Sequence, residues 1–495
     1  MNYHRLAEIA TFFSCAFLLL AGCAPTSTVT VHEAPKNLAA LVSATPYPAF
    51  KKGMDSLFAD SLFPPSNVGV KIVSLSTNEM LYELNPDMLF NPASNQKLFT
   101  SATALTTLGE GFPLSTVVTM DSVEGIIGIK GFGDPLVSTA NLDSLAVSVA
   151  ARLPQRPSWK LIGDVSYFDD LYWGAGWTWD EEPAAYGMFI TPLILNNNTI
   201  DVNVWTNSKP GEPPLVTTSP ATNYVSVENN ATTVADSVRN PIELSRKWRE
   251  RSNIITVRGE VLANGKGAST SLSVWQPERY AITVFSEQLK FLGVPVTGLS
   301  IDTLTGREVE IVRRSHRLDS AVTFMNKVSD NLTAEVLLKC LAAERLGVPG
   351  SAEKGINVVH EFLAARNIDT TRINIADGSG LSRYNLTSAA TVIKLLQAMY
   401  ADKNHFDAFY HSLPVAGVDG TISRRMTGTA AQGNLRAKTG TLSAVSALSG
   451  YVRMADGEML AVSILMQNFP GSSRYYRQTQ DRIGEFLSNL RRDRF

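Results

Sequence analysis

The 495-residue sequence has few cysteines, and only one of them lies in the main part of the chain. Cys15 and Cys23 fall in the N-terminal apolar stretch, which leaves Cys340 without a cysteine partner in the remainder. A disulfide-stabilised fold is therefore excluded for the body of the chain, which is long enough to bury a core that needs none. We predict that Cys340, in the apolar stretch from Leu332 to Leu346, is a plain buried residue.

The sequence also lacks an excess of either charge and, after its first 22 residues, a long apolar run. Lys and Arg number 44 against 46 Asp and Glu, a net charge of −2, so the charge balance favours no nucleic-acid partner. No later run is long enough to cross a bilayer, which excludes a polytopic membrane protein. Hydrophobic residues at 44% and charged residues at 18% are typical of a globular chain of several domains.

Signatures of the commoner hydrolases and of metal sites are absent too. There is no G-x-S-x-G elbow and no H-E-x-x-H, and the six histidines are scattered without a ligand pair. We therefore assign no metal and no cofactor. Gly131-Phe132-Gly133-Asp134 lacks the third glycine and the following helix of a dinucleotide loop, so we interpret it as a turn between strands.

The N-terminus has the pattern of an export signal. Arg5 supplies a weak positive start, and Ile9–Leu20 is an apolar run too short to span comfortably as a mature helix. The next residues, Leu20-Ala21-Gly22-Cys23, resemble a bacterial lipobox, which implies diacylation of the Cys23 sulfur. The alternative is an ordinary signal peptide with an incidental cysteine.

We accordingly predict a signal peptide over residues 1–22 and a Thr-, Ser- and Pro-rich tether over residues 23–44. The residue after the lipobox is Ala24, not the aspartate that commonly retains such lipoproteins at the inner membrane. The expected location is the cell envelope, with the protein exported and lipid-anchored on the periplasmic side of the outer membrane.

The body of the chain mixes helical and strand periodicities. Residues 91–108 predict a helix that starts near Pro92, and Thr387 suits the N-cap of a later one. Further helices are predicted over residues 276–293, 318–328, 331–346, 351–365 and 387–400. Residues 434–453 and 458–467 predict strands joined at Asp456-Gly457, followed by a final helix.

The middle of the chain has a different composition. All seven tryptophans lie between Trp159 and Trp275. Residues 116–275 are also rich in Val, Thr, Ser, Asn and Gly in short alternating runs, which predicts a β-rich insertion. The cluster from Trp173 to Trp179 suits stacking on a glycan, although a structural aromatic cluster is the more frequent arrangement.

Three short polar motifs follow one another along the chain. They are Ser94-Asn95-Gln96-Lys97 at a helix start, Ser329-Asp330-Asn331 between two helices, and Lys438-Thr439-Gly440 on a strand. Each alone is a weak signal, because Ser351-Ala352-Glu353-Lys354 also has the S-x-x-K pattern out of order and its serine suits a helix N-cap. The ordered triple is what indicates chemistry.

The residue types of the triple suit nucleophilic catalysis. Ser94 and Lys97 share one helix face, so the amine can reach the hydroxyl. Serine needs a base, and with no histidine available the lysine must be neutral, which its reference pKa of about 10.4 opposes. Burial and a second cation lower such a pKa, and Lys438 is the natural second cation. Ser329 suits a proton relay to the leaving amine, and Asn331 suits a substrate amide.

In this order the motifs resemble those of the active-site serine penicillin-recognising enzymes. The long interval between Ser94 and Ser329 resembles the D-alanyl-D-alanine carboxypeptidase/endopeptidase (DacB-like) family of low-molecular-mass penicillin-binding proteins. The segments Gly131–Pro135, Asp377–Arg383 and Gly417–Thr421 also resemble that family. The lipoprotein start is not general in it.

The resemblance implies an α/β (α+β) penicillin-binding/serine β-lactamase-like domain with an antiparallel sheet and helices, split by a β-rich inserted domain. This places the enzyme domain at residues 45–115 and 276–495 and the insertion, with a smaller module inside it, at 116–275. It implies removal of terminal D-Ala from peptidoglycan stem peptides, or cleavage of D-Ala–diaminopimelate crosslinks, through an acyl-enzyme. Peptidoglycan peptides and β-lactams are the expected partners, and no oligomeric state is implied.

By the same resemblance Ser94 is the nucleophile, Lys97 the base, and Ser329, Asn331 and Lys438 complete the catalytic group. The backbone N–H groups of Ser94 and Thr441 make the oxyanion hole.

Substrate binding is assigned to Lys438, Thr439 and Gly440, and further to Arg383 and Asp169 for the charged diaminopimelate end. The alternative for Arg383 is a surface ion pair. The alternative for Asp169 is a turn cap, with Asp170 as the substrate-binding aspartate in its place. The alternative functions are a β-lactamase and a non-catalytic wall-binding lipoprotein.

Overall fold

The computed structural model describes residues 47–60, 63–206 and 208–495. The predicted signal peptide, the tether and the lipidation site Cys23 lie outside these residues. Among the described helices, none is long and apolar enough to cross a membrane.

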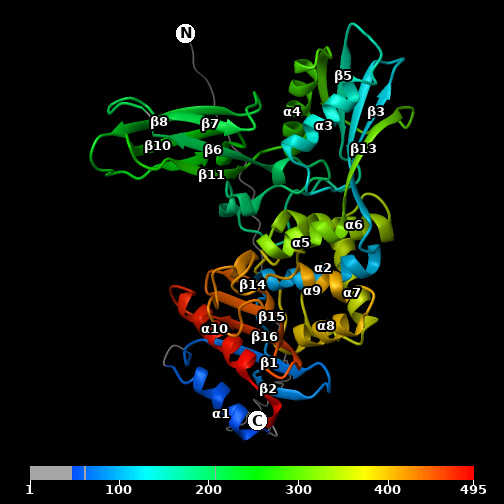
Figure 1. The fold of residues 1–495 in the computed structure, drawn as a ribbon. Coiled ribbons are helices and arrows are strands. Elements are labelled where there is room, and N and C mark those ends of the chain that lie inside the picture. Colours follow the sequence, from blue (N-terminus) through cyan, green and yellow to red (C-terminus); the bar gives the residue numbers. More distant parts are fainter. Residues whose placement is uncertain (1–46, 61–62, 207) are drawn as a thin grey trace, which may run out of the picture. The chain divides into compact units, whose positions relative to one another are not determined.

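One antiparallel sheet is built from the two ends of the described chain (Figure 1), in the order β14-β15-β16-β1-β2. Its strands are β1 (Asn67–Ser74), β2 (Met80–Leu84), β14 (Arg436–Leu442), β15 (Val445–Arg453) and β16 (Met459–Gln467). β1 and β16 pair from Asn67 opposite Gln467 to Ser74 opposite Leu460. β15 and β16 are buried along nearly their whole length, because helices cover both faces of the sheet.

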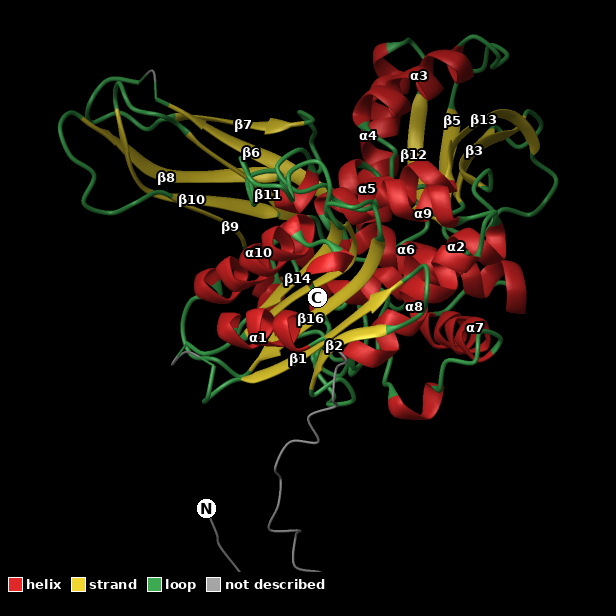
Figure 2. Ribbon diagram, turned by 60° about the horizontal axis from the view of Figure 1, so that its bottom comes forward, coloured by secondary structure: helices red, strands yellow, loops and turns green. Residues whose placement is uncertain are grey.

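The helices lie in two layers against this sheet (Figure 2). On one face, α1 (Pro48–Leu57) and α10 (Arg474–Asn489) bury Phe50, Met54, Ile483 and Leu487 against the strands. The layer on the other face contains α2 (Gln96–Leu108), α5 (Leu318–Val328), α6 (Asn331–Leu346), α7 (Ala352–Ala364), α8 (Ala389–Ala401) and α9 (Phe406–Ser412). Cys340 lies in α6, fully buried and free, as predicted.

Most predicted helix ends lie within two residues of the observed ones, and three details differ. The helix predicted over residues 91–108 begins only at Gln96, after a 3₁₀ turn at Ala93–Asn95. Thr387 is not the N-cap of α8, because Ser388 accepts the hydrogen bond from the backbone N–H of Thr391. Thr387 instead pairs through its backbone with Phe90. The predicted strand over 434–453 is two strands, because the chain reverses between β14 and β15, where Ala444 has a φ of 60°.

The segment predicted as the insertion is rich in strands. With two strands that follow it, β12 and β13, it forms a five-stranded mixed sheet, β12-β5-β4-β3-β13, and it also contains two three-stranded sheets, β8-β10-β9 and β11-β6-β7. The members of the first sheet are β3 (Pro113–Asp121), β4 (Ile126–Gly131), β5 (Trp159–Asp164), β12 (Val296–Ile301) and β13 (Val309–Arg317), and α3 (Thr139–Ala150) and α4 (Pro277–Phe291) pack on it. The other strands are β6 (Thr199–Trp205), β7 (Leu215–Ser219), β8 (Ser226–Val234), β9 (Glu243–Arg246), β10 (Ile254–Leu262) and β11 (Ala268–Ser273).

The five-stranded sheet crosses the boundary that the sequence analysis placed before residue 276. Both β12 and β13 follow that residue, yet they pair with β5 and β3. α4, expected in the enzyme domain, shares a core with Trp159 and Leu161 of β5. The amphipathic pattern of α4 indicates a helix but does not indicate which sheet covers its apolar face.

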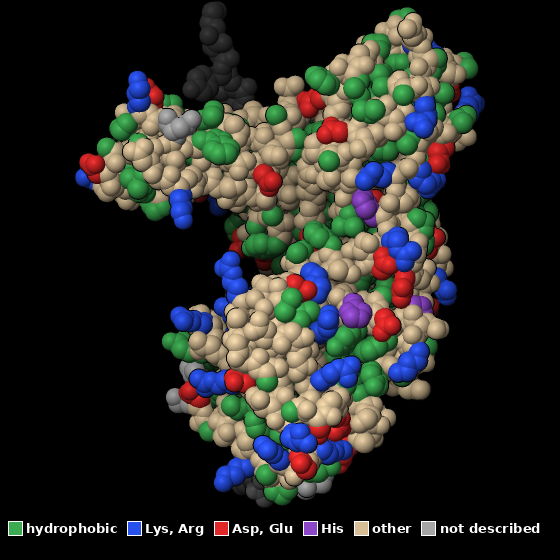
Figure 3. All heavy atoms as spheres, viewed as in Figure 1, with side chains coloured by type: hydrophobic (Ala, Val, Ile, Leu, Met, Phe, Trp, Pro, Cys, Tyr) green, Lys and Arg blue, Asp and Glu red, His purple; other side chains and the backbone are tan. Residues whose placement is uncertain are grey.

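Lys, Arg, Asp and Glu side chains are interspersed over the face in Figure 3, without a large area of one sign.

Candidate active site

Ser94 and Lys97 stand where a 3₁₀ turn, η1 (Ala93–Asn95), runs into α2. Lys97 Nζ donates a hydrogen bond to Ser94 Oγ at 3.1 Å. The turn requires a φ of 45° at Ala93, and Asn91 stabilises it by accepting from the Ala93 N–H at 2.9 Å. The two predicted residues of the first motif are therefore in contact.

Lys97 is completely buried, and each of its three ammonium protons has an acceptor. Besides Ser94, it donates to Asn331 Oδ1 and to the backbone carbonyl of Ser379, both at 2.7 Å. Burial lowers the pKa of Lys97 to about 8, although the carboxylates of Asp377, Asp330 and Glu335 act in the opposite direction. At pH 7 about one lysine in ten is then neutral, against about one in 2,500 for a free side chain.

The second motif is held between two helix ends. Ser329 is the C-cap of α5 with a left-handed φ of 64°, and Asp330 caps α6 by accepting from the Thr333 N–H at 2.7 Å. This tight connection places Asn331 in the first turn of α6, one residue past the cap.

The third motif comes from the edge strand β14. Lys438 Nζ donates to Ser329 Oγ at 2.8 Å and to the carbonyl of Thr439 at 3.0 Å. Burial, and then the nearby Lys97 ammonium, hold the pKa of Lys438 well below its usual range. Thr439 Oγ1 also contacts Thr421 Oγ1 at 2.8 Å. The third motif is thus joined to the second, and the second to the first.

Two glycines allow this close packing around the serine turn. A Cβ on Gly440 would lie 2.6 Å from the carbonyl oxygen of Pro92. A Cβ on Gly380 would lie 1.8 Å from the carbonyl oxygen of Ala93, and Gly380 also has a φ of 85°. The strand and the 377–385 loop can therefore pack this closely against the turn because these two positions lack side chains.

A cavity of about 330 Å³, within the usual range for small ligands, lies over these residues. Its lining is Ser94, Glu181, Tyr186, Ser329, Asn331, Gly380, Leu381, Arg383, Thr441, Leu442 and Ser443. Two of the lining residues are joined, because Arg383 donates to the carbonyl of Ser443 at 2.9 Å. The predicted Ser94, Arg383 and Thr441 thus share one cavity.

Two lining residues come from the insertion and were not expected. Asn331 Nδ2 donates to the backbone carbonyl of Tyr186 at 2.9 Å. Burial and a hydrogen bond to the Glu181 carboxylate raise the pKa of Tyr186 to about 12. The same segment is fastened to the enzyme domain by Trp177, whose indole N–H donates to Asp377 at 2.9 Å. In the sequence, only the density of aromatic residues marked this stretch.

Asp169 is not among the residues that line the cavity. Its carboxylate forms an ion pair with Lys339, whose side chain is 1% exposed and also donates to the carbonyl of Leu171 at 2.6 Å. The prediction that Asp169 faces the substrate is therefore not supported, because a buried lysine on α6 takes up its charge. The acidic side chain in the cavity is Glu181.

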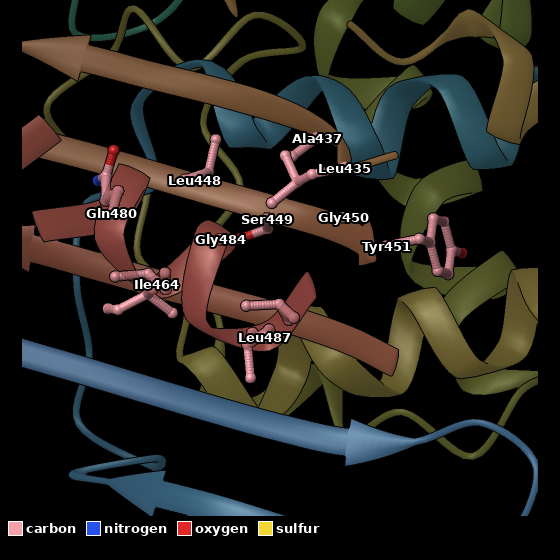
Figure 4. Close-up of a pocket in the computed structure, with 12 residues that line it drawn as sticks. Leu435, Ala437, Leu448, Ser449, Gly450, Tyr451, Ile464, Gln480, Gly484 and Leu487 are labelled. Carbon is pink, nitrogen blue, oxygen red and sulfur yellow. The ribbon is translucent and has the colours of Figure 1, made fainter. Parts of the chain in front are cut away.

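The space shown in Figure 4 does not compete with this cavity as a candidate site. Figure 4 shows a space between α10 and the sheet, lined by side chains including Leu435, Ile464 and Leu487. At about 10 Å³ it has room for about one water molecule, so it is a packing gap. Within the described residues, no group of three or more His, Cys, Asp and Glu side chains is arranged to hold a metal ion.

Comparison with known proteins agrees with this geometry. Residues 50–490 match the D-Ala-D-Ala carboxypeptidase 3 (S13) family. The chain is 34% identical over 442 residues to a D-alanyl-D-alanine carboxypeptidase of Actinomadura sp. (strain R39), covering 85% of this chain and 81% of the relative. It is 28% identical over 437 residues to the D-alanyl-D-alanine carboxypeptidase DacB of Haemophilus influenzae, covering 86% and 90%.

A solved structure shows the same fold. The crystal structure of penicillin binding protein 4 (dacB) from Haemophilus influenzae superposes with a TM-score of 0.76 at 24% identity, covering 88% of this chain and 99% of that one. The class is thus a serine-type carboxypeptidase of α/β fold, which excludes the non-catalytic alternative. The chain belongs to the S13 family of D-Ala-D-Ala carboxypeptidases.

Proposed function

We infer that this carboxypeptidase works through an acyl-enzyme on Ser94, with Lys97 as the base. The observation that carries the proposal is the hydrogen bond from Lys97 Nζ to Ser94 Oγ, made by a fully buried amine whose pKa is lowered to about 8. A neutral lysine at that position can remove the hydroxyl proton as the oxygen attacks.

The reaction then has two halves. Ser94 Oγ bonds to the carbonyl carbon before the terminal D-Ala, the peptide C–N bond breaks, and the departing amine takes a proton. Ser329 suits that delivery, because its hydroxyl accepts from Lys438 at 2.8 Å and lines the same cavity as Ser94. Water next cleaves the ester, which frees the shortened peptide and restores the Ser94 hydroxyl.

The developing oxyanion is assigned to the backbone N–H groups of Ser94 and Thr441, because both residues line this cavity. Asn331 is the residue for the substrate amide. Its Nδ2 group bonds to the Tyr186 carbonyl in the structure, so a substrate amide would exchange with that contact.

The charges in the cavity suit a zwitterionic leaving group. Arg383 and Glu181 both line it, so a carboxylate and an amine of one D-centre would each find an opposite charge. We therefore extend the proposal to D-Ala–diaminopimelate crosslinks, with Glu181 in the role first assigned to Asp169.

Acylation by β-lactams belongs to the same proposal, since a β-lactam ring offers an acyl group to the same serine. The name of the related Haemophilus influenzae protein, penicillin binding protein 4, supports it.

Two purified substrates test the function. A pentapeptide ending in D-Ala-D-Ala and a crosslinked dimer of stem peptides are digested in parallel, and the products are identified by mass. We expect loss of one D-Ala from the first and cleavage of the D-Ala–diaminopimelate bond in the second.

Glu181→Gln should lower kcat/KM on the dimer by about 10–150-fold, the effect of losing a charge-assisted hydrogen bond, and change acylation by benzylpenicillin much less. Equal losses on both would contradict the assigned role of Glu181.

The location is a separate proposal that depends on the lipobox. Cys23→Ala should prevent lipidation and leave an uncleaved precursor or a protein outside the membrane fraction. Metabolic labelling with palmitate measures this, and equal label in parent and variant contradicts the lipoprotein assignment.

A further inference from the structure

The wall of the active site behind Lys97 contains two buried carboxylates that the reaction above does not use. Glu335 is 1% exposed and Asp377 is fully buried. Among the described contacts, their donors are backbone N–H groups and the side chains of Trp177, Ser379 and Asn385, with no lysine or arginine hydrogen-bonded to either. Burying a carboxylate without a paired cation destabilises the fold unless hydrogen bonds compensate for the lost hydration. The hydrogen-bond partners of these two carboxylates therefore indicate their role.

Glu335 holds the loop that in turn holds the base. It lies one helical turn after Asn331 on α6, so both side chains leave the same face of the helix. One carboxylate oxygen accepts from the Gly378 N–H at 3.0 Å and the other from the Ser379 N–H at 2.8 Å. The carbonyl of that same Ser379 accepts from Lys97 Nζ at 2.7 Å.

The neighbouring contacts leave this segment little freedom. Thr100 on α2 donates to the carbonyl of Gly378 at 2.6 Å. Asp377 accepts from the N–H groups of Gly380 at 2.8 Å and Ser382 at 2.7 Å, and from Asn385 Nδ2 at 2.7 Å. The two carboxylates thus bind the donors of the loop, which turns the Ser379 carbonyl toward the lysine.

We propose that Glu335 is the positioning residue of the general base: through the two backbone N–H groups of Gly378 and Ser379 it fixes the carbonyl that holds Lys97 against Ser94. Its negative charge also acts on that lysine. This rests on the proposed role of Lys97 as the base. Glu335 never touches the substrate in this role.

The electrostatics supply the sign of the effect. The charged groups acting on Lys97 are Asp377, Asp330 and Glu335, which raise its pKa, and Lys438, which repels it. Burial and the charge of Asp377 raise the pKa of Glu335. Both of its oxygens accept a backbone N–H, which the ionised carboxylate favours. Removing its negative charge should therefore lower the pKa of Lys97.

Two substitutions separate geometry from charge. Glu335→Gln keeps the length, loses the charge and can accept only one of the two N–H groups. Glu335→Asp keeps the charge but is too short to reach both. The control is Glu278→Gln, because Glu278 is also buried with a raised pKa but lies on α4, bonded to Tyr172.

The measurement is the second-order rate of acylation by a fluorescent penicillin across pH 5–10, with Tm recorded for each variant. In the parent, the rate should rise with pH as Lys97 loses its proton and then reach a plateau. The rising part is called the acid limb. Glu335→Gln should move the limb to lower pH by about one unit or more and lower the plateau about tenfold to a hundredfold. Glu335→Asp should lower the plateau similarly and leave the limb in place, and Glu278→Gln should change neither.

A folded Glu335→Gln variant with the parental limb and plateau overturns the proposal. If that variant does not fold, an unchanged plateau in Glu335→Asp overturns it instead. A parent that shows no acylation at Ser94 contradicts the proposed function itself, which is a different outcome.

Discussion

Replacing Lys97 by arginine removes the base while keeping the positive charge. The lysine amine is fully buried, with acceptors at 2.7, 2.7 and 3.1 Å from its nitrogen. Its pKa of about 8 leaves about one amine in ten neutral at pH 7. An arginine with a pKa above about 12 is neutral in fewer than about one molecule in 10⁵.

The fraction of side chains that are neutral at pH 7, and so able to act as a base, therefore falls by about 10⁴-fold. General-base catalysis typically raises a reaction rate by about 10²–10⁴-fold. Because the larger guanidinium also misfits three closely placed acceptors, we expect acylation to fall by about a thousandfold or more. The remaining rate should no longer rise through an acid limb near pH 8.

The assay is acylation by a fluorescent penicillin in parallel with D-Ala release from a pentapeptide. The matched control is Lys354→Arg, in the second S-x-x-K sequence, where the lysine donates to the carbonyls of Gly347 and Pro349 at the surface. A near-normal acylation rate in a folded Lys97→Arg variant refutes the neutral-lysine mechanism.

Three shorter predictions follow from the same contacts. Ser94→Ala should abolish penicillin labelling and D-Ala release, whereas Ser351→Ala should keep both and cost only about 1 kcal/mol in denaturant unfolding, because Ser351 caps α7. Gly380→Ala should remove acylation and lower Tm, since its Cβ would enter the serine turn and its φ is 85°; parental rates at parental Tm would show that the loop need not approach so closely. Asp169→Asn should lower the free energy of unfolding by about 3 kcal/mol, because it leaves Lys339 buried without its charged partner. The kcat/KM of the folded variant should stay near that of the parent. Selective loss of crosslink cleavage with unchanged stability would return Asp169 to the substrate site.

Local patterns predicted the elements that carry the three motifs. α5 and α6 have the predicted ranges, because apolar spacing and helix caps act within a few residues. The order of the motifs likewise anticipated that Lys97, Ser329 and Lys438 would converge, and the hydrogen bonds join them into one cluster.

Long-range partners could not be predicted in this way. Glu335 on α6 has the sequence context of any helical glutamate, and its role depends on the 377–385 loop folding back onto it. Asp169 and Glu181 are both acidic residues of one aromatic-rich stretch, and only the fold shows that the first meets Lys339 and the second the cavity. The domain boundary failed for the same reason, because strand pairing with β12 and β13 is not encoded locally.

If Ser94 carries the acyl group, a covalent adduct with a β-lactam must form on that residue. The protein is treated with benzylpenicillin, quenched, digested, and the modified peptide is sequenced by mass spectrometry. We expect one penicilloyl group, on Ser94. A modification on Ser329 or Ser351 in place of Ser94 would contradict it, as would an unmodified protein that still releases D-Ala.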